Sequence, residues 1–267
     1  MKRLLIASAM IIAIPTLAQV KEGTVIYERT MLLNIVINDN PAFQNMAPRE
    51  RKDKFELLFT EGKSLWQPIN DEAQSDETAF NDDGGGIRMV FRMPGSNDVI
   101  FHNITDVKKV EQRELFDKTF IITDSIRKLN WKIAGETKTI LGYNCMKATT
   151  QRTQESMRMT MDNGETKRER VKDTLNIVAW FTNEIPGSFG PDMYQGQLPG
   201  TILEIDVNNG RSVFKALEFQ PKVDAAKIKE PTKGKKVTND EFAKEREKLM
   251  QEMQRNSGGR NGIRIGG

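Results

Sequence analysis

Three methionines at alternate positions are the residues whose type and spacing most suggest chemistry. Met157, Met159 and Met161 stand two residues apart. On a β-strand this spacing would place all three thioethers on one face. Soft thioether ligands select Cu(I), so copper handling by an exported protein is one interpretation. The other is a stretch of core or an adaptable apolar contact surface, because methionine fills irregular gaps between side chains.

The sequence contains few of the residues that nucleophilic catalysis or zinc binding requires. His102 is its one histidine and Cys145 its one cysteine, so a zinc site built from His and Cys ligands is excluded by number. No Gly-x-Ser-x-Gly elbow accompanies the histidine. No second Cys or His stands near Cys145 to activate its thiol, which is therefore interpreted as a small buried side chain. We predict no catalytic residue and a protein that is not an enzyme.

Two acidic pairs offer carboxylates for Ca²⁺ binding or proton transfer. Asp82 and Asp83 precede three glycines, and Glu204 and Asp206 are spaced to share one strand face. Neither pair has the spacing of a calcium-binding loop, so solubility and turn formation are the preferred interpretation. Dinucleotide and phosphate-binding glycine motifs are missing from the sequence, and no cofactor is expected.

A dense series of turns between residues 186 and 200 provides the candidate contact surface. Aromatic and β-branched residues around it form strands, and Pro and Gly dipeptides end them. Aromatic side chains beside such loops are typical of binding surfaces, although core packing is the alternative. Trp180 and Phe181 are expected on opposite faces of one strand. The candidate ligand or partner residues are Trp180, Phe181, Phe189, Tyr194, Leu198, Pro199 and Gly200.

The first residues are typical of a secretory signal. Basic Lys2 and Arg3 precede an apolar run from Leu4 to Ile14, and small residues follow up to Ala18. The run falls short of the roughly 20 residues that span a bilayer, and no later segment is long and apolar enough to do so as a helix. We predict cleavage after Ala18 and a periplasmic or secreted protein.

The overall charge argues against nucleic acid as a partner. The chain has 40 Lys and Arg residues against 37 Asp and Glu residues, a net charge of +3, and two of these positive charges lie in the signal. The mature chain is therefore nearly neutral, whereas nucleic-acid-binding domains concentrate positive charge.

Many short segments with period-2 alternation, and little helix between them, predict an antiparallel β-sheet. Such a sheet must cover an apolar face, by curling into a half-barrel or by accepting a helix. Hairpin turns are expected at residues 60–63 and, with Asn-Gly, at 208–211. One early helix is expected around 41–54, and Gly200 is expected at positive φ in a Pro-Gly turn. The expected strands cover 23–37, 55–59, 64–66, 87–92, 99–104, two within 108–123, 137–143, 143–161, 175–182, 202–207 and 212–219.

The composition changes after Pro221, where Lys, Ala and Pro predominate and predict a linker over 222–236. Thr238 and Glu241 have the spacing of a capping box, which predicts a helix over 240–255. Its narrow apolar stripe suggests a marginal helix, and the glycine-rich residues 256–267 are expected to be disordered. The predicted organisation is a signal at 1–18, an antiparallel β domain at 19–221, and a charged tail at 222–267.

The segment 137–205 resembles the GLPGLI family of exported proteins from Gram-negative bacteria. The naming motif reads here Gly196-Gln197-Leu198-Pro199-Gly200-Thr201-Ile202, with Gln197 inserted and Thr201 in place of a leucine. The resemblance implies export and a curved antiparallel sheet similar to that of periplasmic lipoprotein carriers, and implies no reaction. Other matching residues are Lys138, Leu141-Gly142-Tyr143, Cys145, Lys147-Ala148, Ala179-Trp180-Phe181-Thr182, Ile185-Pro186 and Gly190-Pro191.

These observations together predict an exported, non-enzymatic binding or adaptor protein. Its partner would be an apolar ligand, a peptide or a cell-envelope protein, held at the concave face of the curved sheet and bordered by the turns at 186–200. The alternative is a copper-handling protein that uses the three methionines.

Overall fold

The computed structural model describes residues 22–32, 35–36, 50–69, 95–115, 117–162, 165–185, 187–257 and 264–265. The predicted signal at 1–18, the acidic pair Asp82 and Asp83, and the predicted strand at 87–92 lie outside these residues.

Twelve strands form one open sheet, and their order shows two consecutive meanders joined by the first strand. Strands β3 to β7 make one meander and β8 to β12 the other. Strand β1 lies between β3 and β12, with Thr24 opposite both Leu58 and Gln220. The strands are β1 (Gly23–Leu32), β3 (Glu50–Thr60), β4 (Lys63–Pro68), β5 (Val99–Asn103), β6 (Lys108–Leu115), β7 (Lys118–Ser125), β8 (Lys132–Ile140), β9 (Tyr143–Asp162), β10 (Glu165–Thr182), β11 (Thr201–Val207), β12 (Ser212–Gln220) and β13 (Lys235–Val237).

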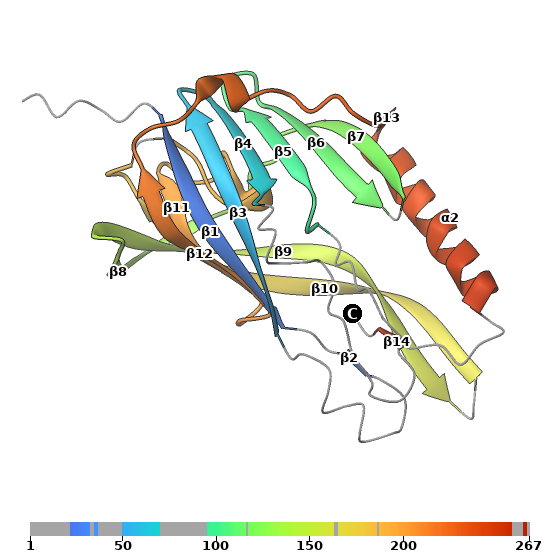
Figure 1. Ribbon diagram of the computed structural model, residues 1–267. Coiled ribbons are helices and arrows are strands. Elements are labelled where there is room, and N and C mark those ends of the chain that lie inside the picture. Colours follow the sequence, from blue (N-terminus) through green and yellow to red (C-terminus); the bar gives the residue numbers. More distant parts are fainter. Residues whose placement is uncertain are drawn as a thin grey trace, which may run out of the picture.

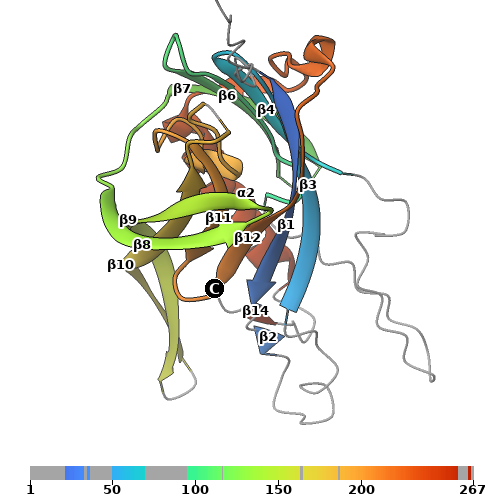
Figure 2. The ribbon, with the colours of Figure 1, turned by 90° about the vertical axis from the view of Figure 1, so that its left-hand side faces the viewer.

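The sheet curls into a half-barrel, as the two views in Figures 1 and 2 show. All pairings are antiparallel except that of β13, which runs parallel to β7 at one edge. The predicted curved antiparallel sheet with a C-terminal helix is thus confirmed, with one parallel strand that the sequence analysis placed in a linker. A separate pair joins β2 (Ile35–Val36) to β14 (Arg264–Ile265).

The predicted strand at 137–143 is interrupted by a turn at Leu141 and Gly142, between β8 and β9. Two other predictions fail for a common reason. The helix expected around 41–54 is wrong where the structure describes it, because β3 begins at Glu50 and pairs with β1. The charged run 167–173 belongs to β10 instead of preceding it. In both segments the cross-strand hydrogen bonds decide the conformation, whereas the local composition favoured another.

The main core fills the concave side of the half-barrel. Alternate residues of the central strands, such as Tyr27, Phe55, Phe59 and Trp66, are almost completely buried there. Phe55 stacks on Trp66 with ring centroids 4.8 Å apart. The Tyr27 hydroxyl donates a 2.5 Å hydrogen bond to the Ile202 carbonyl, which satisfies a polar group in an otherwise apolar region.

The charged tail is an ordered part of the fold and wraps around the β7 edge of the sheet. Ile228 packs on the convex face with Leu58, Leu65 and Phe101. The chain then adds β13 to the edge and turns into α2 (Asn239–Ser257). On the concave face Phe242 of α2 meets Phe120 edge-on, with 5.4 Å between ring centroids. The tail therefore contacts the sheet on both faces and along one edge.

The predicted capping box at the start of α2 is confirmed. The Glu241 carboxylate accepts from the Thr238 backbone N–H at 2.8 Å, and the Glu241 N–H donates to the Thr238 hydroxyl at 3.2 Å. Two otherwise unpaired donors of the first turn are satisfied in this way. The helix begins where the sequence analysis predicted, but its stability comes from packing against β7.

Gly200 is required for a different reason from the one expected. It is absent from the glycines at positive φ, which include Gly187 and Gly196. A Cβ at Gly200 would lie 2.2 Å from the carbonyl oxygen of Thr182. The close approach of two backbone segments, and not a left-handed turn, excludes a side chain here.

We expect Gly200→Ala to lower the free energy of unfolding by at least about 2 kcal/mol, because the backbone must move to accept the methyl group. Gly135→Ala is the matched control, since a Cβ there meets nothing within 4 Å and its effect should stay within about 0.5 kcal/mol. Urea unfolding of the two variants measures both values. Equal stability of the two would contradict this account of Gly200.

We expect Phe242→Ala to destabilise the fold by about 3 kcal/mol, because Phe242 is buried between α2 and the sheet. Leu217→Ala serves as control, since Leu217 is 46% exposed and its loss should cost less than about 0.5 kcal/mol. The measurement is the urea-induced unfolding midpoint. An unchanged midpoint for Phe242→Ala would show that the tail is a dispensable appendage.

Candidate functional site

Most of the predicted contact residues lie in the core. Phe181, Phe189, Tyr194 and Leu198 are each no more than 3% exposed, and Gly200 is buried as well. The Phe189 ring stacks on Phe59 with centroids 4.3 Å apart. These side chains therefore pack inside the half-barrel and do not form an exposed surface; core packing, the alternative in the sequence analysis, is the arrangement observed.

Segment 187–200 acts as an internal plug on the concave face. It leaves the sheet at the end of β10, passes through the short helix η1 (Asp192–Tyr194) and returns to β11. Gln195 is fully buried and its side chain accepts a hydrogen bond from the Ser64 hydroxyl of β4. The Thr201 hydroxyl donates to the Ile185 carbonyl at 3.1 Å. The plug is thus held by a hydrogen bond that joins its two flanking residues, by the contact of Gln195 with Ser64, and by aromatic packing.

Gln197, the residue inserted in the family motif, ties this plug to the segment that crosses the open side of the half-barrel. Residues 126–131 connect β7 to β8, which lie near opposite edges of the sheet (Figure 2). The Gln197 side chain accepts from the Leu129 N–H and donates to the Arg127 carbonyl, each at 2.9 Å. The departure from the motif therefore supplies two hydrogen bonds across the mouth.

Trp180 and Pro199 are the predicted contact residues that retain exposure. Trp180 is half-buried on the face opposite Phe181, as predicted. The Lys138 ammonium lies 4.4 Å from the Trp180 ring centroid and forms a 2.7 Å ion pair with Glu204. Lys147 lies 5.9 Å from the same ring. Trp180 is thus covered by two cations, an arrangement that stabilises the outer face of the sheet.

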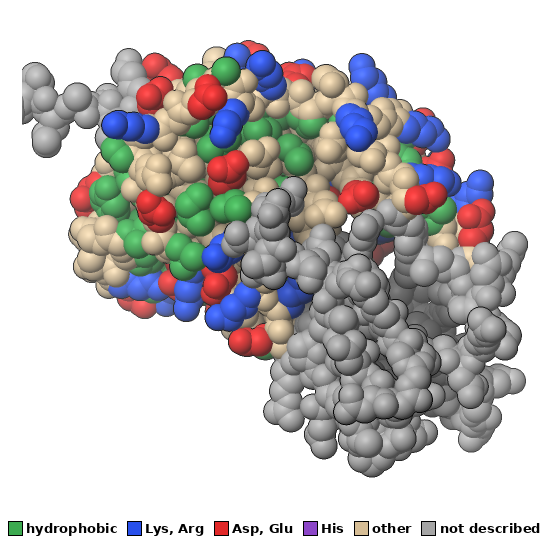
Figure 3. Space-filling model, viewed as in Figure 1, with side chains coloured by type: hydrophobic (Ala, Val, Ile, Leu, Met, Phe, Trp, Pro, Cys, Tyr) green, Lys and Arg blue, Asp and Glu red, His purple; other side chains and the backbone are tan. Residues whose placement is uncertain are grey.

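The outer face carries no large apolar patch in the view of Figure 3. Acidic and basic side chains are interspersed there, with small groups of apolar atoms between them. Ion pairs such as Lys52 with Glu28 cross between neighbouring strands. Exposed pairs of this kind contribute little to stability.

A cluster of charges is buried on the concave face beyond the plug. Glu111, only 1% exposed, accepts from Arg113 at 2.6 Å and pairs with Lys109. Asp98 lies 3.7 Å from the same guanidinium. His102 is buried alongside, and among the residues that the structure describes its Nδ1 has no hydrogen-bond partner. A second pair, Arg29 with Asp53 at 2.7 Å, occupies the same face.

Burial and neighbouring charges shift the pKa values of the side chains in this cluster. Burial raises the pKa of Asp98 to about 6, against the opposing effect of Arg113. Burial would also raise the pKa of Glu111, but Arg113 and Lys109 outweigh it and hold that pKa below its usual range. Burial, with Lys109 nearby, lowers the pKa of His102 to about 3. At neutral pH the cluster thus contains a neutral imidazole between fixed ion pairs.

The thiol of Cys145 is not activated as a nucleophile. The one cysteine, Cys145, is buried, and burial raises the pKa of its thiol to about 11. A thiol with such a pKa is a poor nucleophile at neutral pH. No group of three or more His, Cys, Asp or Glu residues suited to a metal ion occurs in the described part of the chain.

The three methionines lie on β9, opposite Arg170, Arg168 and Thr166 of β10. Their side chains are not among those that the structure describes, so the copper interpretation stays a prediction.

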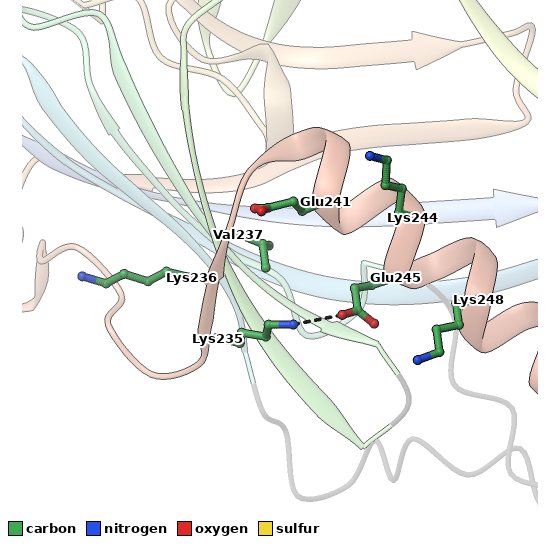
Figure 4. A pocket seen from close by; sticks show the side chains of 7 residues that line it. All are labelled: Lys235, Lys236, Val237, Glu241, Lys244, Glu245 and Lys248. Atoms are coloured by element: carbon green, nitrogen blue, oxygen red, sulfur yellow. Dashed lines mark hydrogen bonds and ion pairs between the residues drawn. The ribbon is translucent and has the colours of Figure 1, made fainter.

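A groove between β13 and α2 offers an accessible site at the opposite edge of the sheet from β8. Its volume is about 330 Å³. Figure 4 shows the Glu245 carboxylate reaching Lys235, an ion pair of 2.9 Å. The lining residues are Lys235, Lys236, Val237, Glu241, Lys244, Glu245 and Lys248.

The sequence analysis predicted neither the buried charges nor this groove, although the sequence contains an indication of each. Lys109, Glu111 and Arg113 alternate along one strand, so three charges on one face could have indicated a polar interior. Lys235 and Lys236 stand immediately before the capping box, which places two lysines beside a helix start. The residues that pair with them come from other elements and could not be identified.

A family model matches part of the chain. Residues 131–204 match the model of a family described as a protein of unknown function, Porph_ging, which is the GLPGLI family. The resemblance is confirmed over this segment, which includes Lys138, Trp180 and Glu204. No curated protein matches the chain, and the described residues contain no helix long and apolar enough to cross a membrane.

Two solved structures of PNGF-II are similar to most of this chain. The structure in space group P21 is 17% identical, with a TM-score of 0.49, over 85% of this chain and 34% of that one. The structure in space group C2 is 16% identical, with the same TM-score, over 84% and 32%. The chain thus spans about one third of the length of PNGF-II.

We expect the stability contributed by Asp98 to disappear as the pH rises from about 4 to about 6. The carboxyl group has a higher pKa in the folded protein than its usual 3.8, so folding is favoured while it is protonated. Asp98→Asn cannot ionise and should show a smaller loss of stability over this pH range, with a difference of about 2 kcal/mol.

The measurement is urea unfolding at pH 4, 5, 6 and 7 for both proteins. Glu218→Gln, which changes an exposed carboxylate, is the control and should follow the wild-type profile. Parallel profiles for wild type and Asp98→Asn would show that Asp98 is not buried in this cluster.

Proposed function

We propose that this chain, whose residues 131–204 match the GLPGLI family, is an exported, non-enzymatic binding or adaptor protein. Its partner is a cell-envelope protein or peptide that binds on the outside of the half-barrel. An apolar ligand within the concave face, the other partner considered from the sequence, is less compatible with the way that face is filled.

The observation that carries this proposal is the internal plug. A carrier of apolar molecules needs an apolar cavity that encloses most of its ligand. Here Phe189, Tyr194 and Leu198 occupy the concave face, and Phe189 stacks directly on Phe59. The residues that would bind a ligand in a carrier are used to pack the protein against itself.

The state of the polar groups supports a role without catalysis. His102 is buried and neutral, and the Cys145 thiol is buried with a raised pKa. Glu111, Arg113 and Lys109 are committed to ion pairs. A general base needs to reach the proton that it removes, and the described surroundings of these groups provide fixed partners instead.

Export is part of the proposal and rests on the sequence. The basic, apolar and small-residue segments up to Ala18 are typical of a cleaved signal, and the family resemblance implies the same location. A single cysteine requires no disulfide, so the fold is compatible with an oxidising compartment.

The internal plug predicts that the purified mature protein takes up no apolar probe. Titration with a fluorescent fatty acid should give no saturable binding, and native mass spectrometry should give the mass of the polypeptide alone. Phe189→Ala is the matched variant: it opens an apolar cavity beside Phe59 and should gain binding of a small probe such as benzene.

Wild-type protein that retains a stoichiometric apolar molecule would contradict the adaptor proposal and favour a carrier. Amino-terminal sequencing of the protein from cell fractions tests export separately. The periplasmic or secreted form should begin at Gln19, and an uncleaved protein in the cytoplasm would contradict export.

A further inference from the structure

The groove between β13 and α2 combines two features that recognise polypeptides. Strand β13 is the last strand of the sheet on this side, with β7 as its one neighbour among the described strands. The edge of such a strand presents backbone N–H and C=O groups to which an extended chain can hydrogen-bond. Helix α2 forms the opposite wall (Figure 4). A few residues of an extended segment would fit between them.

The charge of the groove selects the partner. Four lysines and two glutamates line it. Both glutamates are already engaged within the chain: Glu245 pairs with Lys235, and Glu241 accepts from Thr238 in the capping box. Lys236 points away from α2, on the other face of β13 from Lys235 (Figure 4). In the part of the chain that the structure describes, Lys244 and Lys248 form no ion pair. The groove therefore presents an excess of positive charge that an acidic segment would neutralise.

Positive charge is also concentrated in the carboxy-terminal part of the sequence, which contains the groove. Residues 222–267 contain 12 Lys and Arg residues against 7 Asp and Glu residues, a net charge of +5. The complete chain carries only +3, so residues 1–221 have a net charge of −2. The tail is the positive end of a molecule that is otherwise slightly acidic, and this asymmetry orients an acidic partner toward the groove.

We propose that the β13–α2 groove binds an extended acidic segment of a partner protein, which adds as a strand beside β13 while its carboxylates meet Lys244 and Lys248. This inference rests on the proposed binding function and assigns it a surface and a partner chemistry. An anionic lipid surface would also meet the lysines, but it would make no use of a strand edge.

The test uses the full mature protein and three fluorescent peptides in anisotropy titrations. One peptide alternates Glu with Val, the second alternates Glu with Pro, and the third alternates Lys with Val. The Glu–Val peptide should bind with an affinity that falls as salt is added. The Glu–Pro peptide should bind at least tenfold more weakly, because each proline fixes φ at about −65°, away from the extended strand conformation, and removes an N–H donor. The Lys–Val peptide should not bind.

Charge reversal locates the site. Lys244→Glu with Lys248→Glu should weaken binding of the Glu–Val peptide at least tenfold. Lys227→Glu with Lys229→Glu changes two exposed lysines of the same tail outside the groove and should leave the affinity within twofold. The thermal unfolding midpoints of both variants should match that of the wild type, because these lysines are exposed.

Three outcomes would overturn the inference. Equal binding of the Glu–Val and Glu–Pro peptides would exclude strand addition. Equal loss of affinity in both charge-reversal variants would exclude the groove as the site. Binding to vesicles of anionic phospholipid, with none to the Glu–Val peptide, would favour a membrane surface instead. Each of these leaves the proposed function standing, since that is tested by apolar probe uptake and by the amino terminus of the exported protein.

Discussion

The constraint on which this structure depends is that an open, curved sheet cannot bury its own concave face. A closed barrel solves the problem by meeting its own edge, but here β8 and β13 remain apart. The chain covers the concave face with two of its own segments: the plug formed by 187–200 and the helix α2. The family motif lies in the first of these, so its turns and glycines are explained by the space available inside the half-barrel. Gly200 is the clearest case, because the carbonyl of Thr182 occupies the position that a Cβ would need.

Much of the architecture follows from local sequence. Period-2 alternation identified most described strands, Asn208-Asn209-Gly210 formed the expected hairpin with positive φ at all three residues, and the capping box at Thr238 marked the start of a helix. These features succeed because turn chemistry and capping depend on residues only a few positions apart. Of the candidate contact residues, Trp180 and Pro199 retain exposure, whereas Phe181, Phe189, Tyr194 and Leu198 lie in the core. Dense aromatics among turns suit a binding surface and a folded-in plug equally well, and only the curvature of the sheet distinguishes them.

The features that could not be predicted depend on contacts between distant parts of the chain. Gln197 hydrogen-bonds to residues about seventy positions earlier, and Glu111 becomes a buried charge only because Arg113, Lys109 and Asp98 converge around it. The Lys, Ala and Pro content of residues 222–236 predicts a linker. The anchoring residues of the tail are spaced irregularly because Ile228 packs on the convex face, whereas Val237 and Phe242 pack together on the concave face. No helix or strand period describes a segment that changes face in this way.

The central position of β1 has a consequence for the order in which the protein can fold. The two meanders are local in sequence and can each form from neighbouring strands, but they are joined through β1, whose partner β12 ends at Gln220. This pairing closes a loop of nearly the whole domain, and such non-local contacts form slowly. Until it forms, the halves remain separate and the core between them is open. A chain built in this way can complete its core only after β12 has been synthesised, close to the end of the sheet.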